Sequence, residues 1–182
     1  RLPFGEYRVD VRVIRPGRTI ELVEASATVD DRPVVIARAW RLVHSSTAQI
    51  AAAPVRPMPR PDEVPPWPIS RRWPGTFAAT LDVRAEDDPE GRGTRAWIRS
   101  SHDILLGEPD PVAGFIALTD VANAIAPRHT PPGWFYPNVE LTVHLQRLPR
   151  PGWVGVDSWV SFGDGGLGTT TSLLHDEDGP VG

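Results

Sequence analysis

The sequence predicts an α+β fold in which antiparallel sheets pack against a helix, with this arrangement present twice in the chain. Three observations predict it: an apolar helical segment between Val112 and Ala126, an alternating strand between Val139 and Gln146, and an internal repeat. The 182 residues are 40% hydrophobic and 23% charged, which is typical of a globular chain that buries one large or two small cores.

Three antiparallel strands are predicted near the N-terminus, joined by turns rich in Gly, Pro and Asp. Their residues are 8–14, 19–29 and 34–43. In the second strand the alternation of apolar residues slips between Leu22 and Val23, which predicts a β-bulge. Three strands alone have little core to cover them, so this sheet needs a further element to pack against.

A proline-rich connector follows the first sheet. Residues 44–76 contain eight prolines and no sustained periodicity, and proline lacks an amide donor and fixes its own φ, so an extended segment is predicted. Two tryptophans, Trp67 and Trp73, are expected to pin it to a surface. The predicted organisation is residues 1–43 as the C-terminal part of a first domain, residues 44–76 as a linker and residues 77–182 as a second domain.

The second domain is predicted to hold a buried helix among strands. The predicted strands cover residues 77–84, 94–100, 139–146, 153–162 and 167–174. The helix between Val112 and Ala126 is apolar around most of its circumference, which indicates that other elements surround it. Its one polar stripe consists of Thr119, Asp120 and Asn123. An acid on such a helix needs a partner, because carboxylates are seldom buried without one.

An internal repeat relates the two domains. Residues 1–3 (RLP) recur as residues 147–149, and residues 31–34 (DRPV) recur as residues 178–181 (DGPV), at offsets of 146 and 147. The same elements follow in the same order between these matches, which indicates a duplicated domain. If the copies match, the first lacks a helix and a strand, and the second lacks its last strand. We therefore expect a double domain whose first copy is truncated.

Composition narrows the classes of function. The net charge of −4 and the scattered arginines argue against nucleic-acid binding. No stretch reaches the roughly 20 apolar residues that a membrane-spanning helix needs. With no cysteine, the chain has no disulfide, thiol nucleophile or cysteine-ligated metal. A cytoplasmic protein is expected, and homo-oligomerisation is compatible with the composition.

Four segments carry a resemblance to a known family. They are residues 13–18 (VIRPGR), 117–120 (ALTD), 137–147 (PNVELTVHLQR) and 178–179 (DG). In wording and order they resemble the acyl-CoA thioesterase II family and its thioesterase-like relatives. The resemblance implies an α+β double hotdog, in which two antiparallel sheets each wrap around a central helix. It also implies an acyl-CoA-type substrate, a role in fatty acid metabolism, and no cofactor or metal.

The resemblance also implies how the site acts. In the family, an acid on the second helix, a hydroxyl or amide residue at the start of the next strand and a glutamine on the last strand position a water that attacks the thioester. Carried over residue by residue, the acid is Asp120 and the second position is Asn138, where better-known members have Thr or Ser; the glutamine would follow Gly182. A carboxylate can act as base toward that water and an amide can orient it. The implied function is hydrolysis of acyl-CoA or related acyl thioesters.

Each candidate residue also has a structural interpretation. Asp120 can bond to loop amides, and Asn138, which follows a proline, can simply form a turn. Asn138 shares its phase with the outward positions of the predicted strand, so it reaches Asp120 only if that strand begins with a bend or bulge. Trp134 and Phe135 either line an acyl-binding pocket or belong to the core.

Two other functions stay open. Because Asn138 replaces a hydroxyl residue, the chain can be a catalytically inactive double hotdog that binds acyl groups or a protein partner. Asp120, Asn123 and His129 also resemble the acid, Asn and His set of hotdog enoyl-CoA hydratases, although Pro127 interrupts that segment.

Overall fold

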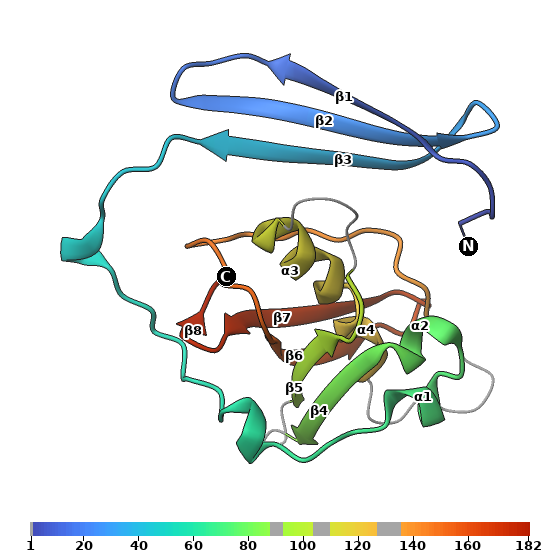
Figure 1. Ribbon diagram of the computed structural model, residues 1–182, viewed down its shortest axis with the longest axis vertical. Coiled ribbons are helices and arrows are strands. Elements are labelled where there is room, and N and C mark those ends of the chain that lie inside the picture. The colour runs from blue at the N-terminus through green and yellow to red at the C-terminus, as the bar shows by residue number, and fades with distance from the viewer. Residues whose placement is uncertain (1, 88–92, 104–109, 127–135) are drawn as a thin grey trace. The chain divides into compact units, whose positions relative to one another are not determined.

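The computed structural model describes residues 2–87, 93–103, 110–126 and 136–182 (Figure 1). They fall into two compact units, Arg1–Ala52 and Ala53–Gly182. Each unit has its own antiparallel sheet, of three strands in the first and five in the second. Among the described helices, none has the length and apolar character that a membrane crossing requires.

The first unit is a three-stranded meander in the order β1 (Arg8–Arg15), β2 (Ile20–Val29) and β3 (Arg32–Leu42). Asp30 and Asp31 both adopt positive φ, as a tight hairpin turn requires, and they join β2 to β3. The three strands predicted near the N-terminus are thereby confirmed.

The pairing of β1 with β2 contains the predicted bulge. Val13 pairs with Val23, but Arg15 pairs with Leu22, so the register shifts by one residue between these pairs. The extra residue is Ile14, which lies on β1 and has no partner on β2. The slip in apolar phase between Leu22 and Val23 therefore marks the bulge correctly, although the inserted residue lies on β1.

The two faces of the first sheet differ in chemistry. One face carries an aliphatic array across all three strands, consisting of Val9, Val11, Val13, Val23, Ala25, Ala27, Val35, Ala37 and Ala39. On the other face Glu24 accepts hydrogen bonds from Arg12 at 2.7 Å and from Arg38 at 2.8 Å. The bond from Arg12, followed by that from Arg38, lowers the pKa of Glu24 below its ordinary value. The cross-strand charges thus specify the polar face and the register.

The second unit packs helices on a five-stranded sheet in the order β4 to β8. Its strands are β4 (Leu81–Asp87), β5 (Thr94–Ser100), β6 (Val154–Phe162), β7 (Gly168–Asp176) and β8 (Gly179–Pro180), and its α-helices are α1 (Ile69–Arg72), α2 (Thr76–Ala79), α3 (Pro111–Thr119) and α4 (Ala122–Ile125). α3 packs on β5 and β6, and α4 packs on β6 and β7. Phe115, Leu118 and Ile125 of the helices share one buried core with Val156 and Leu174 of the sheet.

The proline-rich segment packs against the second unit through its tryptophans. The backbone N–H of Trp67 donates to the carbonyl of Val83 at 2.8 Å, and the indole Nε1 of Trp73 donates to the carbonyl of Ala124 at 2.8 Å. Both rings also pack against the core. The expectation that tryptophans pin this segment is confirmed, and the second unit begins at Ala53.

The internal repeat is visible in the pairing of the strands. Shifted by 147 positions, the pairs Val9 with Ala27 and Thr28 with Pro33 of the first sheet become the pairs Val156 with Leu174 and His175 with Pro180 of the second. Up to the bulge at Ile14, β1–β2–β3 and β6–β7–β8 therefore follow one register. The duplication inferred from short identities is confirmed by backbone pairing.

The helix predicted between residues 112 and 126 is interrupted, so the prediction of one continuous helix is wrong. Between α3 and α4 the N–H of Val121 donates to the carbonyl of Leu118 at 3.2 Å, three residues back rather than four. Such a tightened turn ends the regular α-helical ladder. It leaves Asp120 at the C-terminal end of α3.

Residues 139–146 do not form a paired strand among the described elements, contrary to the sequence prediction. Under the repeat, the counterpart of the eleven-residue β3 in the second unit is the two-residue β8, so no described strand lies beside this segment. The segment meets the end of β8 where the N–H of Gln146 donates to the carbonyl of Val181 at 2.8 Å. Val139 is 95% exposed, so the alternation of apolar residues does not correspond to a buried face at this end.

His175 is a fully buried titratable side chain on β7. Its exposure is 0%, and neither ring nitrogen makes a hydrogen bond of good geometry to the described part of the chain. Burial lowers the pKa of His175 below its ordinary value of 6.5, against smaller raising effects from nearby backbone groups and from Asp157 and Asp176. The folded chain therefore holds His175 neutral at a pH where an exposed histidine is already protonated.

We expect the free energy of unfolding to fall as the pH drops from about 7.5 to about 5.5. In this range His175 binds a proton in the unfolded chain but stays neutral in the folded chain, so acid favours unfolding. Urea unfolding at the two pH values measures the change. Replacing His175 by Phe should weaken the pH dependence, whereas replacing the exposed His102 by Phe should leave it in place. An equal pH dependence in both variants would contradict this account.

Candidate active site

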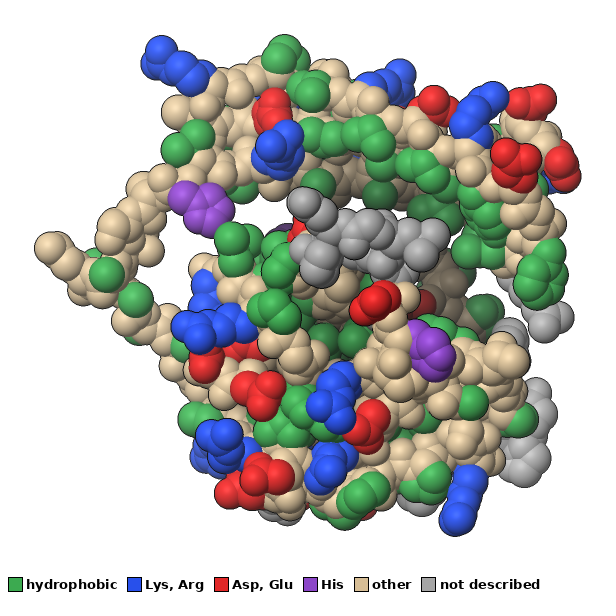
Figure 2. All heavy atoms as spheres, in the orientation of Figure 1, with side chains coloured by type: hydrophobic (Ala, Val, Ile, Leu, Met, Phe, Trp, Pro, Cys, Tyr) green, Lys and Arg blue, Asp and Glu red, His purple; other side chains and the backbone are tan. Residues whose placement is uncertain are grey.

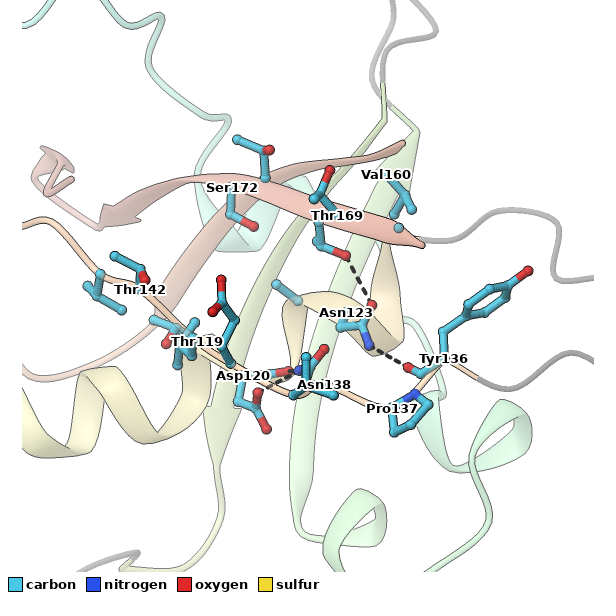
Figure 3. A pocket seen from close by; sticks show the side chains of 18 of the residues that line it. Thr119, Asp120, Asn123, Tyr136, Pro137, Asn138, Thr142, Val160, Thr169 and Ser172 are labelled. Carbon is cyan, nitrogen blue, oxygen red and sulfur yellow. Dashed lines mark hydrogen bonds between the residues drawn. The ribbon is translucent and has the colours of Figure 1, made fainter. Parts of the chain in front are cut away.

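A pocket of about 670 Å³ lies in the second unit beside the break between α3 and α4 (Figure 3). The helix break, β6, β7 and the extended segment 136–144 form its walls. Its polar lining includes Thr119, Asp120, Asn123, Asn138, Thr142, Thr170 and Ser172, and its apolar lining includes Val143, Val160, Phe162 and Leu174. A concave site with apolar walls and a few convergent polar groups is the usual form of a small-molecule site.

The two predicted catalytic residues meet in this pocket. Nδ2 of Asn138 donates to Oδ1 of Asp120 at 2.6 Å and makes a longer contact of 3.4 Å with the Asp120 carbonyl. Figure 3 shows these two side chains turned toward one another. Within the described residues, the second carboxylate oxygen of Asp120 and Oδ1 of Asn138 have no protein donor. Both atoms can therefore accept hydrogen bonds from a water molecule or a ligand.

The sequence places Asp120 on a helix that is expected to be surrounded by other elements. In the structure the side chain of Asp120 is exposed. The tightened turn ends α3 at this residue, and Asn138 is its partner. Asn138 reaches the acid because residues 136–140 are not held in a strand ladder, so the alternation of a strand does not fix the direction of its side chain. The sequence required a bend or bulge at the start of the strand for Asn138 to reach Asp120. In the structure an unpaired segment takes the place of that bend.

The start of α3 is fixed by its own sequence. The carboxylate of Asp110 accepts from the N–H of Val112 at 2.8 Å and of Ala113 at 3.1 Å, and Pro111 occupies the first helical position. An acidic N-cap followed by proline is a strong start signal for a helix. The Asp110 N-cap sets where α3 begins, and the tightened turn sets where it ends. Together they place Asp120 at the C-terminal end of α3.

A second asparagine holds the segment that carries Asn138. Nδ2 of Asn123 donates to the carbonyl of Tyr136 at 2.9 Å, and the hydroxyl of Thr170 donates to Oδ1 of Asn123 at 3.0 Å. The polar stripe of the predicted helix includes Asn123 but implies no contact with Tyr136. Thr170 carries no signal of its own, because it is one of three consecutive threonines on β7.

An ion pair fixes the chain just after the C-terminal end of the extended segment. The guanidinium of Arg147 donates to the two oxygens of Asp176 at 2.6 and 2.5 Å. Asp176 is 2% exposed and also accepts from the N–H groups of Arg150 and Asp178. Burial alone raises the pKa of Asp176, but the hydrogen bonds from Arg147, Arg150 and Asp178 outweigh burial and hold this pKa below its ordinary value. The bond to Asp176 raises the pKa of Arg147.

Other residues singled out in the sequence lie outside the described residues. They are Trp134 and Phe135, expected at an acyl pocket, and Pro127 and His129 of the hydratase comparison. In the described ranges, no group of three or more His, Asp or Glu side chains is arranged to hold a metal ion. Basic and acidic side chains are interspersed over the face drawn in Figure 2 rather than gathered into one basic surface.

The five-stranded antiparallel sheet with helices packed on it is typical of a hotdog-type domain, and the three-stranded sheet of the first unit repeats its register. Residues 54–182 match the family described as acyl-CoA thioesterase C-terminal domain, and the chain belongs to that family. The resemblance seen in the sequence is therefore confirmed. No protein of curated function matches the sequence significantly.

Solved structures share this fold. A candidate thioesterase II from Thermobifida fusca is similar with a TM-score of 0.71 at 21% identity, over 96% of this chain and 70% of that one. A protein of unknown function with a hot dog fold from Alicyclobacillus acidocaldarius gives 0.64 at 16% identity, over 96% and 68%. An acyl-CoA thioesterase II from Mycobacterium marinum gives 0.53 at 17% identity, over 95% and 68%. The α+β double hotdog predicted from the sequence is thereby confirmed.

Proposed function

We propose that this chain hydrolyses acyl-CoA or related acyl thioesters with a water molecule held by Asp120 and Asn138. The observation that carries the proposal is the 2.6 Å hydrogen bond between Nδ2 of Asn138 and Oδ1 of Asp120 at the wall of a pocket. Membership of the acyl-CoA thioesterase C-terminal domain family supports the choice of substrate. The exposure of both residues supports access by water.

The reaction uses Asp120 as the base. Its second carboxylate oxygen accepts a hydrogen bond from the water and takes the proton as the water oxygen attacks the thioester carbonyl carbon. Oδ1 of Asn138 accepts the other water hydrogen and orients the attack. The tetrahedral intermediate then collapses with cleavage of the C–S bond, and the leaving thiolate recovers the proton from Asp120. The products are a carboxylic acid and free CoA thiol, and the carboxylate is regenerated.

The identity of Asn138 favours direct attack by water. A threonine or serine hydroxyl can be acylated, whereas a side-chain amide is a poor nucleophile that serves as a donor and acceptor of hydrogen bonds. One N–H of Nδ2 is engaged by Asp120, and within the described residues Oδ1 of Asn138 remains free to accept from the water. Trp134 and Phe135 precede Tyr136 of the pocket wall in sequence, and we assign them to contacts with the acyl chain.

Release of free thiol from a panel of acyl-CoA substrates of different chain length tests this proposal. Thiol release above the uncatalysed rate on at least one substrate is expected. Binding of acyl-CoA without release would instead identify an acyl-binding double hotdog without catalysis. Addition of water to an enoyl-CoA without thiol release would identify a hydratase. Either of these results would overturn the proposed hydrolysis.

Variants of Asn138 separate orientation from simple packing. Replacing Asn138 by Leu is expected to lower kcat by about 10- to 100-fold, because a hydrogen bond involving the charged Asp120 is lost. Replacing it by Thr should keep more of the rate, because a hydroxyl also donates and accepts. Thiol release by the three proteins, compared at saturating acyl-CoA, measures the effect. A Leu variant as active as the wild-type protein would exclude Asn138 from the reaction.

A further inference from the structure

We infer that Asn123 and Thr170 form a positioning pair that holds Asn138 in place against Asp120. This inference rests on the proposed function and assigns the pair a role through Asn138, because Asn123 bonds to Tyr136 and Thr170 bonds to Asn123. The pair connects three elements of the pocket: α4, the extended segment and β7. Figure 3 shows Asn123 between Tyr136 and β7.

The orientation of the Asn123 amide is fixed by the chemistry of its partners. The carbonyl of Tyr136 can only accept, so the side-chain nitrogen of Asn123 must face it, at 2.9 Å. The side-chain oxygen then faces Thr170, whose hydroxyl donates to it at 3.0 Å. Asn123 is half-buried, so water competes less for these bonds than at an exposed site. Two bonds of opposite sense therefore lock one rotamer.

The bond to Tyr136 acts two residues before Asn138. Pro137 lies between them, and its ring fixes φ, so a fixed Tyr136 carbonyl leaves Asn138 few directions to take. The ring of Tyr136 also lies 4.5 Å from the ring of Phe162 between centroids, which gives a second hold on this residue. Small displacements at Tyr136 are therefore passed on to Asn138.

Two side chains beside the helix break hold the extended segment by hydrogen bonds. Asp120 and Asn123 are three residues apart across the helix break, and Asp120 bonds to Asn138 while Asn123 bonds to Tyr136. Residues 136–140 have no strand ladder, so these side-chain bonds replace the backbone hydrogen bonds that normally fix a strand. Thr170 ties the arrangement to β7 near the start of that strand. The geometry of the acid–amide pair is thus set by Asn123 and Thr170.

Replacing Thr170 by Val tests the pair, because it removes the hydroxyl donor with little change in volume. We expect kcat for acyl-CoA hydrolysis to fall about three- to tenfold, with KM changed less than about twofold. Replacing Asn123 by Ala should have a larger effect, about 10- to 100-fold, because both bonds are lost. Replacing Asn123 by Asp should not rescue the rate, because a carboxylate keeps the acceptor for Thr170 but loses the donor to Tyr136. Thr28 to Val in the first unit is the matched control and should leave kcat unchanged.

A double-mutant cycle separates positioning from general stability. If Thr170 acts through Asn138, then adding Thr170→Val to Asn138→Ala should change kcat no further. A multiplicative loss in the double variant would overturn the inference, since it would mean that Thr170 acts by another route. A second result would also overturn it. Thr170→Val would lower kcat together with the unfolding midpoint, and it would do so equally in the wild-type and Asn138→Ala backgrounds.

Nuclear magnetic resonance supplies a test that does not depend on activity. The chain contains only two asparagines, Asn123 and Asn138, so protein labelled with ¹⁵N-asparagine shows two pairs of side-chain amide signals, and loss of one pair in Asn138→Ala assigns them. In Thr170→Val the signals of Asn138 should shift toward the values of an unstructured peptide. Unchanged Asn138 signals would overturn the positioning role even in an active enzyme. An inactive wild-type protein whose Asn138 signals do shift would instead remove the proposed function and keep the structural link.

Discussion

Replacing Asp120 by Asn is expected to lower kcat/KM for acyl-CoA hydrolysis by about 10²- to 10⁴-fold. The amide keeps the size of the carboxylate, but it cannot take the proton of the attacking water. KM should change little, because the acid acts on the water rather than on bound substrate. Thiol release by wild-type and variant protein, measured with the best substrate of the acyl-CoA panel, gives the ratio.

A matched substitution distinguishes this effect from a general change of charge. Asp62 is exposed, with 82% of its side chain accessible, and its replacement by Asn should leave kcat/KM unchanged. Asp120 is also exposed, so the unfolding midpoint should be similar for both variants. Full activity of the Asp120→Asn protein would remove this residue from the mechanism. Equal losses in both variants would point to net charge as the cause.

Replacing Asp176 by Ala is expected to lower the free energy of unfolding by about 3 kcal/mol. The change removes two hydrogen bonds to Arg147 and two to backbone N–H groups, and it leaves a guanidinium that is 35% exposed without its partner. The folded chain holds the pKa of Asp176 below its ordinary value of 3.8, so its stabilisation is present above that pH and is lost as the pH falls further. Urea unfolding near neutral pH measures the loss.

An exposed ion pair nearby serves as the control. Arg150 and Asp178 lie 2.6 Å apart with side chains 75% and 51% exposed, and water screens such pairs. Replacing Asp178 by Ala should therefore cost less than about 1 kcal/mol. A loss as large as that of the Asp176 variant would contradict the importance assigned to the buried pair. The difference between wild type and the Asp176 variant should also shrink in acid.

The elements read best from the sequence are those whose signals are local. The alternating strands of the first sheet, the bulge beside Leu22 and the core positions Phe115 and Leu118 of α3 follow from apolar phase alone. The repeat gave the duplicated register because the turn motif at residues 178–181 keeps the spacing of residues 31–34. Local periodicity and turn chemistry were sufficient for these features.

The features that the sequence did not predict depend either on partners far along the chain or on a local turn that the residue types do not mark. Alternation predicted a strand at residues 139–146, but a strand also needs a neighbour, and β8 pairs along only two residues. The break after Asp120 arises from hydrogen bonds three residues back, which have no composition signal. Thr170 joins the site from β7, 47 positions after Asn123, and nothing in its threonine run marks it. The family resemblance identifies the acid and the amide, whereas their supporting contacts appear only in the folded chain.

A single-turnover reaction in H₂¹⁸O, with enzyme in excess over acyl-CoA, tests the central claim that water held by Asp120 attacks the thioester directly. Direct attack places ¹⁸O in the released carboxylic acid and leaves the peptide containing Asp120 unlabelled, as measured by mass spectrometry. Label in the Asp120 peptide together with an unlabelled acid would contradict the account, because it would mean that the carboxylate itself had become acylated.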